Sequence, residues 1–215
     1  MEGAIRKAAS LIAVRRAGEG PEVLVVERGA QSRFLPGYVA FPGGATDVGD
    51  ADLATRWFGS SVEAPRACAV RELAEEVGLV LTAQGLRAGT RGTLDDPAAS
   101  PPTVDQLPRI AHWVAPEDVP VRFDADYFAV AAEAGIEPEP DGGEVARAWW
   151  ASPGRLLAEW AEGTRRLYWP TYFTLQHLAA CARMEDLLAL RIPTREADDH
   201  EVARLPRSIF WQDEG

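Results

Sequence analysis

The chain has 215 residues, of which 47% are hydrophobic and 26% are charged, a balance typical of a globular protein. Its formal net charge of −11 disfavours binding to a nucleic-acid backbone, and its apolar runs are shorter than the ~20 residues that span a bilayer. The N-terminus does not resemble a signal peptide, and the two cysteines, Cys68 and Cys181, fit neither a disulfide framework nor a metal knuckle. We therefore expect a cytoplasmic protein without membrane or nucleic-acid partners.

The first half of the chain predicts strands and then a helix. Residues 8–16 and 21–29 are β-rich and flank a turn, which predicts a hairpin, and residues 37–41 predict a short strand before Pro42-Gly43-Gly44. From residue 64 to residue 77 apolar residues recur at helical spacing, and Gly78 is expected to end that helix. The apolar stripe consists of Val70, Leu73, Ala74 and Val77.

The second half predicts more strands and two final helices. Residues 84–108 are rich in Gly, Pro and Ala and predict a long surface loop, followed by strands at 110–115, 126–132 and 144–150. Ser152 and Pro153 are expected to open a helix that ends near Gly163. A long helix is predicted over residues 171–190, with an irregular tail after Pro193. This order predicts an α/β fold with a mixed sheet between helices.

The helix at 64–77 carries a cluster of acids. Glu72, Glu75 and Glu76 are three and four residues apart and share one face, where like charges repel. Carboxylates are suitable ligands for Mg²⁺ or Mn²⁺, which would remove that repulsion. With the apolar stripe on the opposite face, we expect the carboxylates to point outward and Arg71 to orient one of them. The alternative is a solvated helix face without a ligand.

The same helix matches part of a known motif. Arg71, Glu72, Leu73, Glu75, Glu76, Gly78 and Leu79 fit the second half of the Nudix box, G-x5-E-x7-R-E-U-x-E-E-x-G-U, where U is a bulky aliphatic residue. The chain resembles the Nudix hydrolase superfamily, which implies a Nudix fold in a single domain over residues 1–215. An insertion at about 51–62 and a C-terminal helical extension at about 152–190 are additions to that domain.

The box is split, so two residues compete for the place of its upstream glutamate. Glu63 stands seven residues before Arg71, as the box requires, but Trp57 then falls where the box has glycine. Counting forward five residues from Gly44 reaches Asp50 instead. We favour Glu63 because its spacing to the helix is intact.

The Nudix resemblance implies metal-dependent hydrolysis of a nucleoside diphosphate linked to another group. It implies that Glu72, Glu75, Glu76 and the Gly44 carbonyl bind Mg²⁺ or Mn²⁺, with Glu72 also in proton transfer. Arg71 orients a carboxylate on this reading. Glu144 precedes a tryptophan-bearing strand and is either a further ligand, the general base, or a solvated turn acid.

A second motif lies upstream, in "LVVERGAQSRFLPGYVAFPGG". It resembles the signature of the coenzyme A diphosphatase branch, L-L-T-x-R-[SA]-x3-R-x3-G-x3-F-P-G-G, although Val25, Val26 and Gly29 depart from it. Residues 112–132 and 144–160 are similar to longer, peroxisome-type members of that branch. The matching positions are Leu24, Arg28, Arg33, Gly37, Phe41, Pro42, Gly43 and Gly44.

The coenzyme A resemblance implies a small-molecule substrate, coenzyme A or an acyl-coenzyme A, cleaved to 3′,5′-ADP and 4′-phosphopantetheine or its acyl form. It implies that Arg28, Arg33, Gly43 and Gly44 bind the substrate; arginine suits phosphate because its fork grips oxygens in pairs. Two alternatives stay open: another nucleoside-diphosphate derivative such as a nucleotide sugar, dinucleotide or NADH, or a non-catalytic nucleotide-binding module. The sequence also leaves open whether the protein is a monomer or a homodimer.

Overall fold

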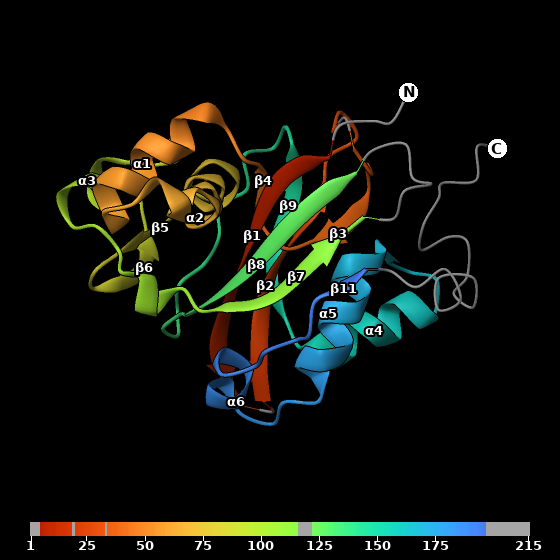
Figure 1. Cartoon of the computed structure of the whole chain (residues 1–215). Helices are drawn as coiled ribbons and strands as arrows, with labels where there is room; N and C mark the ends of the chain where they lie inside the picture. Colours follow the sequence, from red (N-terminus) through yellow and green to blue (C-terminus); the bar gives the residue numbers. More distant parts are fainter. Residues whose placement is uncertain (1–4, 19, 33, 116–121, 197–215) are drawn as a thin grey trace.

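A curled mixed sheet forms the centre of the protein, with helices on both of its faces (Figure 1). The computed structural model describes residues 5–18, 20–32, 34–115 and 122–196. Within these ranges nine strands form the sheet, in the order β10-β3-β2-β1-β8-β7-β11, with β4 also paired to β1 and β9 to β2. The predicted α/β architecture is confirmed.

The predicted N-terminal hairpin is the middle of this sheet. β1 pairs antiparallel with β2 through Val14 and Val23, and parallel with β8 through Leu11 and Phe128. The middle of each central strand is buried, which agrees with the continuous apolar runs in their sequences. The strands are β1 (Arg6–Ala17), β2 (Gly20–Arg28), β3 (Tyr38–Ala40), β4 (Gly43–Ala45), β7 (Arg109–Val114), β8 (Phe123–Ala131), β9 (Val145–Ala151), β10 (Arg166–Leu167) and β11 (Arg195–Glu196).

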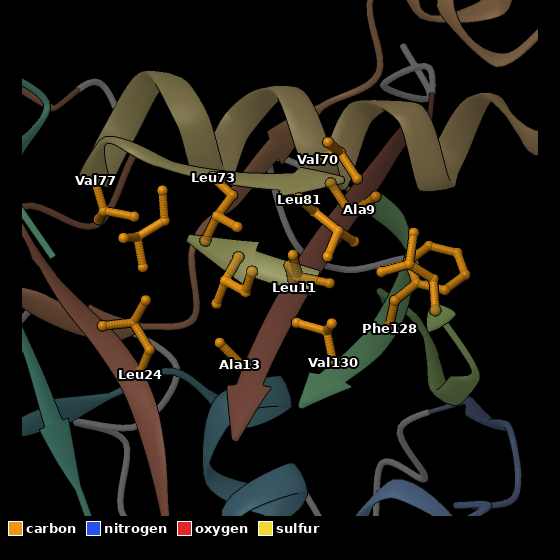
Figure 2. Packing of buried hydrophobic residues seen from close by; sticks show 14 of the residues in the cluster. Ala9, Leu11, Ala13, Leu24, Val70, Leu73, Val77, Leu81, Phe128 and Val130 are labelled. Atoms are coloured by element: carbon orange, nitrogen blue, oxygen red, sulfur yellow. The ribbon is translucent and has the colours of Figure 1, made fainter. Parts of the chain in front are cut away.

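The acidic helix α2 (Ala64–Val77) covers one face of the sheet. Its apolar stripe packs on β1, and Figure 2 shows Val70, Leu73 and Val77 above Leu11 and Ala13. These five side chains are fully buried. Gly78 caps the helix with φ of 65°, a left-handed conformation that glycine adopts without strain. The predicted helix, its apolar face and its end are therefore confirmed, and the stripe fixes how the helix is rotated about its axis.

The opposite face of the sheet is covered by the C-terminal helices. Ser152 caps α4 (Pro153–Ala161) by accepting a hydrogen bond from the Arg155 backbone N–H at 3.3 Å, as predicted. The predicted long helix divides into α5 (Trp169–Ala179) and α6 (Met184–Leu188). Alanine-rich sequence favours a continuous helix. The buried side chains between these helices and the sheet, which include Trp169, Leu175 and Leu187, form a second core, and a turn after α5 returns the chain to it.

The extra residues of the split box form a helix of their own, α1 (Val48–Phe58). Asp47 and Asp50 make a capping box at its start, in which the Asp47 N–H donates to the Asp50 carboxylate at 2.7 Å. Trp57 is only 7% exposed and packs in the core beside α2, with Phe58 partly buried against it. Both side chains attach the insertion to the sheet.

The loop predicted over residues 84–108 is wrong in its detail. A hairpin of β5 (Leu79–Thr82) and β6 (Gly85–Ala88) leads into it, followed by α3 (Asp95–Ala99) and η2 (Val104–Gln106), while η1 (Ser61–Glu63) precedes α2. These elements are too short for periodicity to reveal. β11 also pairs with β7 inside the tail predicted to be irregular, and the remainder of that tail lies outside the described residues.

Each helix in the described ranges is too short or too polar to pass through a lipid bilayer.

The partly exposed ion cluster of Lys7, His112 and Asp124 predicts that the free energy of unfolding depends on pH. Burial raises the pKa of Asp124, but hydrogen bonds from His112 (2.6 Å) and Lys7 (2.5 Å) lower it more, so the net shift is downward. Because the pKa of Asp124 is lower in the folded state, its ionised form stabilises the fold at pH values above the ordinary pKa of aspartate. This stabilisation is lost as the pH falls through the folded-state pKa. In urea unfolding, the advantage of the natural chain over Asp124→Asn should shrink from about pH 5 to about pH 3. A constant difference would contradict this assignment.

Candidate active site

The turn between β3 and β4 lies against the carboxylates of α2. A Cβ added to Gly44 would collide with the Glu72 carboxylate, and one added to Gly43 would collide with the Ala9 carbonyl and the Ser10 side chain. Glycine at position 43 therefore lets β4 lie close against β1, and glycine at position 44 leaves room for the Glu72 carboxylate. The predicted meeting of the Gly-Gly turn and the acidic helix is present in the structure.

Arg71 gathers carboxylates from two helices. Its Nε and Nη2 donate to the two oxygens of Asp50 at 2.8 and 3.1 Å, while its Nη1 donates to Glu72 and to Glu75, both at 2.8 Å. The Asp50 carboxylate is fully buried. The arginine thus joins α1 to α2 by a bidentate pair and orients the helix carboxylates, the role expected for Arg71.

Our preference for Glu63 as the upstream acid of the box is wrong. Glu63 forms an ion pair with Arg66 on the other side of α2, whereas Asp50 pairs with Arg71. Spacing along the chain favoured Glu63, but α1 folds back and brings Asp50 to the arginine. The capping box at the start of α1 holds Asp50 in place.

The expectation that all three helix carboxylates point outward is also wrong. Glu75 is exposed, but Glu76 is only 4% exposed and accepts a hydrogen bond from the Gly43 backbone N–H at 2.9 Å. Burial, followed by the charge of Glu72, raises the pKa of Glu76 to about 8. Burial also raises the pKa of Glu72, against the opposing influence of Arg71. The α2 face therefore places carboxyl groups with raised pKa values next to the turn.

Glu144 joins this acidic group from the loop before β9. Its charge contributes to the raised pKa values of both Glu72 and Glu76, which places it near the carboxylates of α2. Its backbone carbonyl accepts from the Gly29 N–H at 2.7 Å, and its carboxylate lies 3.1 Å from Arg28 Nη2. Residues far apart in the sequence thus face one another across the turn.

The donor set fits a hard divalent cation in type and charge. Glu72, Glu75, Glu76 and Glu144 offer carboxylate oxygens. Burial is the main cause of the raised pKa values of Glu72 and Glu76, and the repulsion between carboxylates that adds to it is the kind that a bound cation relieves. As placed, the described residues contain no group of three His, Cys, Asp or Glu side chains ready to hold a metal ion. Glu72 and Glu75 instead share Arg71 Nη1, which donates a hydrogen bond to each.

Arg28 organises the loop between β2 and β3. Its Nε donates to the Phe34 carbonyl at 2.7 Å and to Ser32 Oγ at 3.0 Å, and its own carbonyl accepts from the Gly37 N–H at 2.9 Å. Leu35 in this loop has a φ of 49°, a left-handed conformation that leucine rarely adopts. Arg28 therefore holds a strained loop as well as facing Glu144, and Arg33 lies outside the described residues.

A cavity of about 710 Å³ opens beside these groups. Arg28, Gly43, Gly44 and Glu144 line one part of it, so every described member of the predicted substrate-binding set contacts this space. Sequence reasoning missed the aromatic side chains that line the rest, because they come from four separate segments of the chain. The available signal was the alternation of Phe123, Ala125 and Tyr127 along β8, which places their side chains on one face of the sheet. These aromatic residues are Phe34, Tyr38, Phe41, Trp113, Phe123, Tyr127, Tyr168 and Trp169.

Comparison with known proteins agrees with this geometry. The crystal structure of a NUDIX hydrolase from Alicyclobacillus acidocaldarius is 32% identical, covers 89% of this chain and 99% of that one, and superposes with a TM-score of 0.76. A Caenorhabditis elegans relative, whose name places it among the nudix hydrolases, is 38% identical over 80 residues. That match covers 37% of this chain and 24% of the relative, so the chain spans about a quarter of that protein's length.

The family model of the NUDIX domain matches residues 4–169, which include the turn, both helices α1 and α2, and Glu144. The match extends over most of the chain. Together with the Alicyclobacillus structure, it establishes that the chain belongs to the Nudix hydrolase family, whose members cleave diphosphate compounds.

Proposed function

We propose that this Nudix hydrolase cleaves the diphosphate bond of coenzyme A or an acyl-coenzyme A, giving 3′,5′-ADP and 4′-phosphopantetheine or its acyl form. The observation that carries the proposal is the cavity that joins the Gly43-Gly44 turn to Arg28 and Glu144. Arg28, Gly43 and Gly44 are members of the coenzyme A signature in the sequence. Their presence around one space, next to the acidic helix, supports a substrate with a diphosphate and a bulky second group.

We assign the metal ligands to the α2 carboxylates. Glu72, Glu75 and Glu76, with the Gly44 carbonyl, would hold Mg²⁺ or Mn²⁺. Bound divalent ions neutralise diphosphate charge and make a coordinated water more acidic. In this assignment Glu72 takes part in proton transfer, Arg71 orients Glu72 and Glu75, and Glu144 is a ligand or the general base.

The test is incubation of the protein with coenzyme A, a panel of its thioesters and Mn²⁺, with product masses as the readout. Release of 3′,5′-ADP is expected. If no member of the panel yields 3′,5′-ADP, the coenzyme A proposal is wrong, and ADP-ribose, NADH and dinucleotides are the next substrates to try. That second candidate is favoured by Val26 and Gly29, which depart from the signature.

Arg28→Ala tests whether the signature arginine matters. The change removes the contacts to Phe34 and Ser32 and the partner of Glu144, so we expect kcat/KM on the best thioester to fall about 10–100-fold. Arg87→Ala, an exposed arginine paired with Asp96 outside the cavity, is the matched control and should stay within about twofold. Unchanged turnover in Arg28→Ala would remove the main support for the coenzyme A assignment.

A further inference from the structure

The lining of the cavity has two chemically different parts. The turn, Arg28 and Glu144 form its polar end, and the eight aromatic side chains named above form most of the remaining wall, which we call the aromatic chamber. A volume of about 710 Å³ falls within the ~300–1,000 Å³ typical of small-molecule sites. A substrate whose diphosphate lies at the turn therefore has room for a second group in the chamber.

The chamber is built from the core of the protein. Phe123, Ala125 and Tyr127 alternate along β8 and line it from the sheet, and Trp113 lines it from the neighbouring strand β7. Trp169, at the start of α5, is 1% exposed and contacts Trp113 edge to face, with ring centroids 5.6 Å apart. Such buried and mutually packed rings form a preformed wall.

Phe34 forms part of the chamber at its less buried side. Its ring lies 5.3 Å from that of Phe123 and 5.6 Å from that of Tyr168, both edge to face. Its carbonyl is held by Arg28 Nε, which connects this wall to the polar end. Phe34 is therefore positioned by the same residue that faces Glu144.

Charge decides which part of a substrate fits the chamber. Among the lining residues in the described ranges, Arg28 carries the positive charge and Glu144 the negative charge, and both lie at the polar end. Among the described lining residues, a phosphate in the chamber would meet aromatic and small side chains and no cation, which is unfavourable. The nucleoside of coenzyme A carries a 3′-phosphate, whereas its pantetheine arm is uncharged.

We propose that the aromatic chamber binds the uncharged, amide-containing arm of the substrate and any acyl group attached to it, and leaves the nucleoside and its 3′-phosphate outside. This inference rests on the proposed function, since it assumes that the diphosphate lies at the Gly43-Gly44 turn. Ala125 occupies the middle of the β8 wall and leaves space in the chamber that a larger side chain would fill.

The test is a binding measurement rather than turnover. Fluorescence of the tryptophans, which include Trp113 and Trp169 in the chamber, is followed while acyl-4′-phosphopantetheine or 3′,5′-ADP is added to the natural protein, Ala125→Leu and Phe34→Ala. We expect Ala125→Leu to weaken binding of the acyl arm about tenfold and Phe34→Ala several-fold, with the Kd for 3′,5′-ADP within about twofold of the natural value. Ala98→Leu, exposed on α3, is the matched control and should change neither Kd.

Phe34→Ala lies in a surface loop and adds no volume, so it tests the proposal even if leucine at position 125 prevents folding. The proposal is overturned if acyl-4′-phosphopantetheine does not bind the natural protein or if neither variant weakens its binding. It is also overturned if the variants weaken the binding of acyl-4′-phosphopantetheine and of 3′,5′-ADP equally. These outcomes are separate from failure of the proposed function, which is recognised by the absence of 3′,5′-ADP from the thioester panel.

Discussion

Asp50→Ala is expected to lower the free energy of unfolding by about 3–5 kcal/mol, the range for breaking one side of a buried ion pair. The Asp50 carboxylate is fully buried and accepts two hydrogen bonds from Arg71, and it also caps the start of α1. Removal of the Asp50 carboxylate leaves the Nε–H and one Nη2–H of Arg71, whose side chain is largely buried, without this hydrogen-bond acceptor. Urea unfolding followed by circular dichroism measures the loss.

Glu63→Ala is the matched control for that prediction. Glu63 is the other acid compatible with the split Nudix box, and its pair with Arg66 lies at a partly exposed position. We expect a loss of about 1 kcal/mol or less. If Glu63→Ala destabilised the protein more than Asp50→Ala, the assignment of Asp50 as the structural acid of the box would be wrong.

Glu72→Gln is expected to reduce kcat on the best substrate by about 10²–10⁴-fold, the range for loss of a group that transfers a proton. The substitution keeps the shape of the side chain and removes a negative charge beside Glu76, where the charges of these residues repel. Stability should therefore be maintained or increased while activity falls, a combination typical of a functional residue. Initial rates of 3′,5′-ADP formation and thermal unfolding of the same samples measure both effects.

Glu63→Gln, at the N-terminus of α2, is the control and should retain turnover within about twofold, since Glu63 faces Arg66 and not the turn. Titration of activity with Mn²⁺ adds a second readout, because loss of a ligand raises the metal concentration needed for half-maximal rate. Full turnover in Glu72→Gln would show that the Glu72 carboxylate is not required for the reaction, and its assignment to proton transfer would be wrong.

The sequence by itself determined the features that depend on short-range patterns. The spacing of Val70, Leu73 and Val77 predicted α2 and its buried face, and Gly78 and Ser152 marked helix ends correctly. The motif residues of the box predicted the family, which the comparison confirms. Each of these depends on neighbours within one or two helical turns, and such relations are present in the sequence itself.

The tertiary structure decided which distant residues meet. Asp50, and not Glu63, is the partner of Arg71 because α1 folds back on α2. Glu76 is buried where the Gly43 N–H donates to its carboxylate. The division of the last helix followed from burial of Leu187 in the second core.

The aromatic chamber depends most strongly on tertiary structure. Its side chains come from four segments of the chain, residues 34–41, β7, β8 and residues 168–169 at the start of α5. Their meeting depends on strand order and on how α5 packs on the sheet, and neither has a local signal in the residues. Local periodicity therefore determined the main helices and strands and the acidic face of α2. Long-range packing decided that Asp50 pairs with Arg71 on that helix and that a cavity opens beside it.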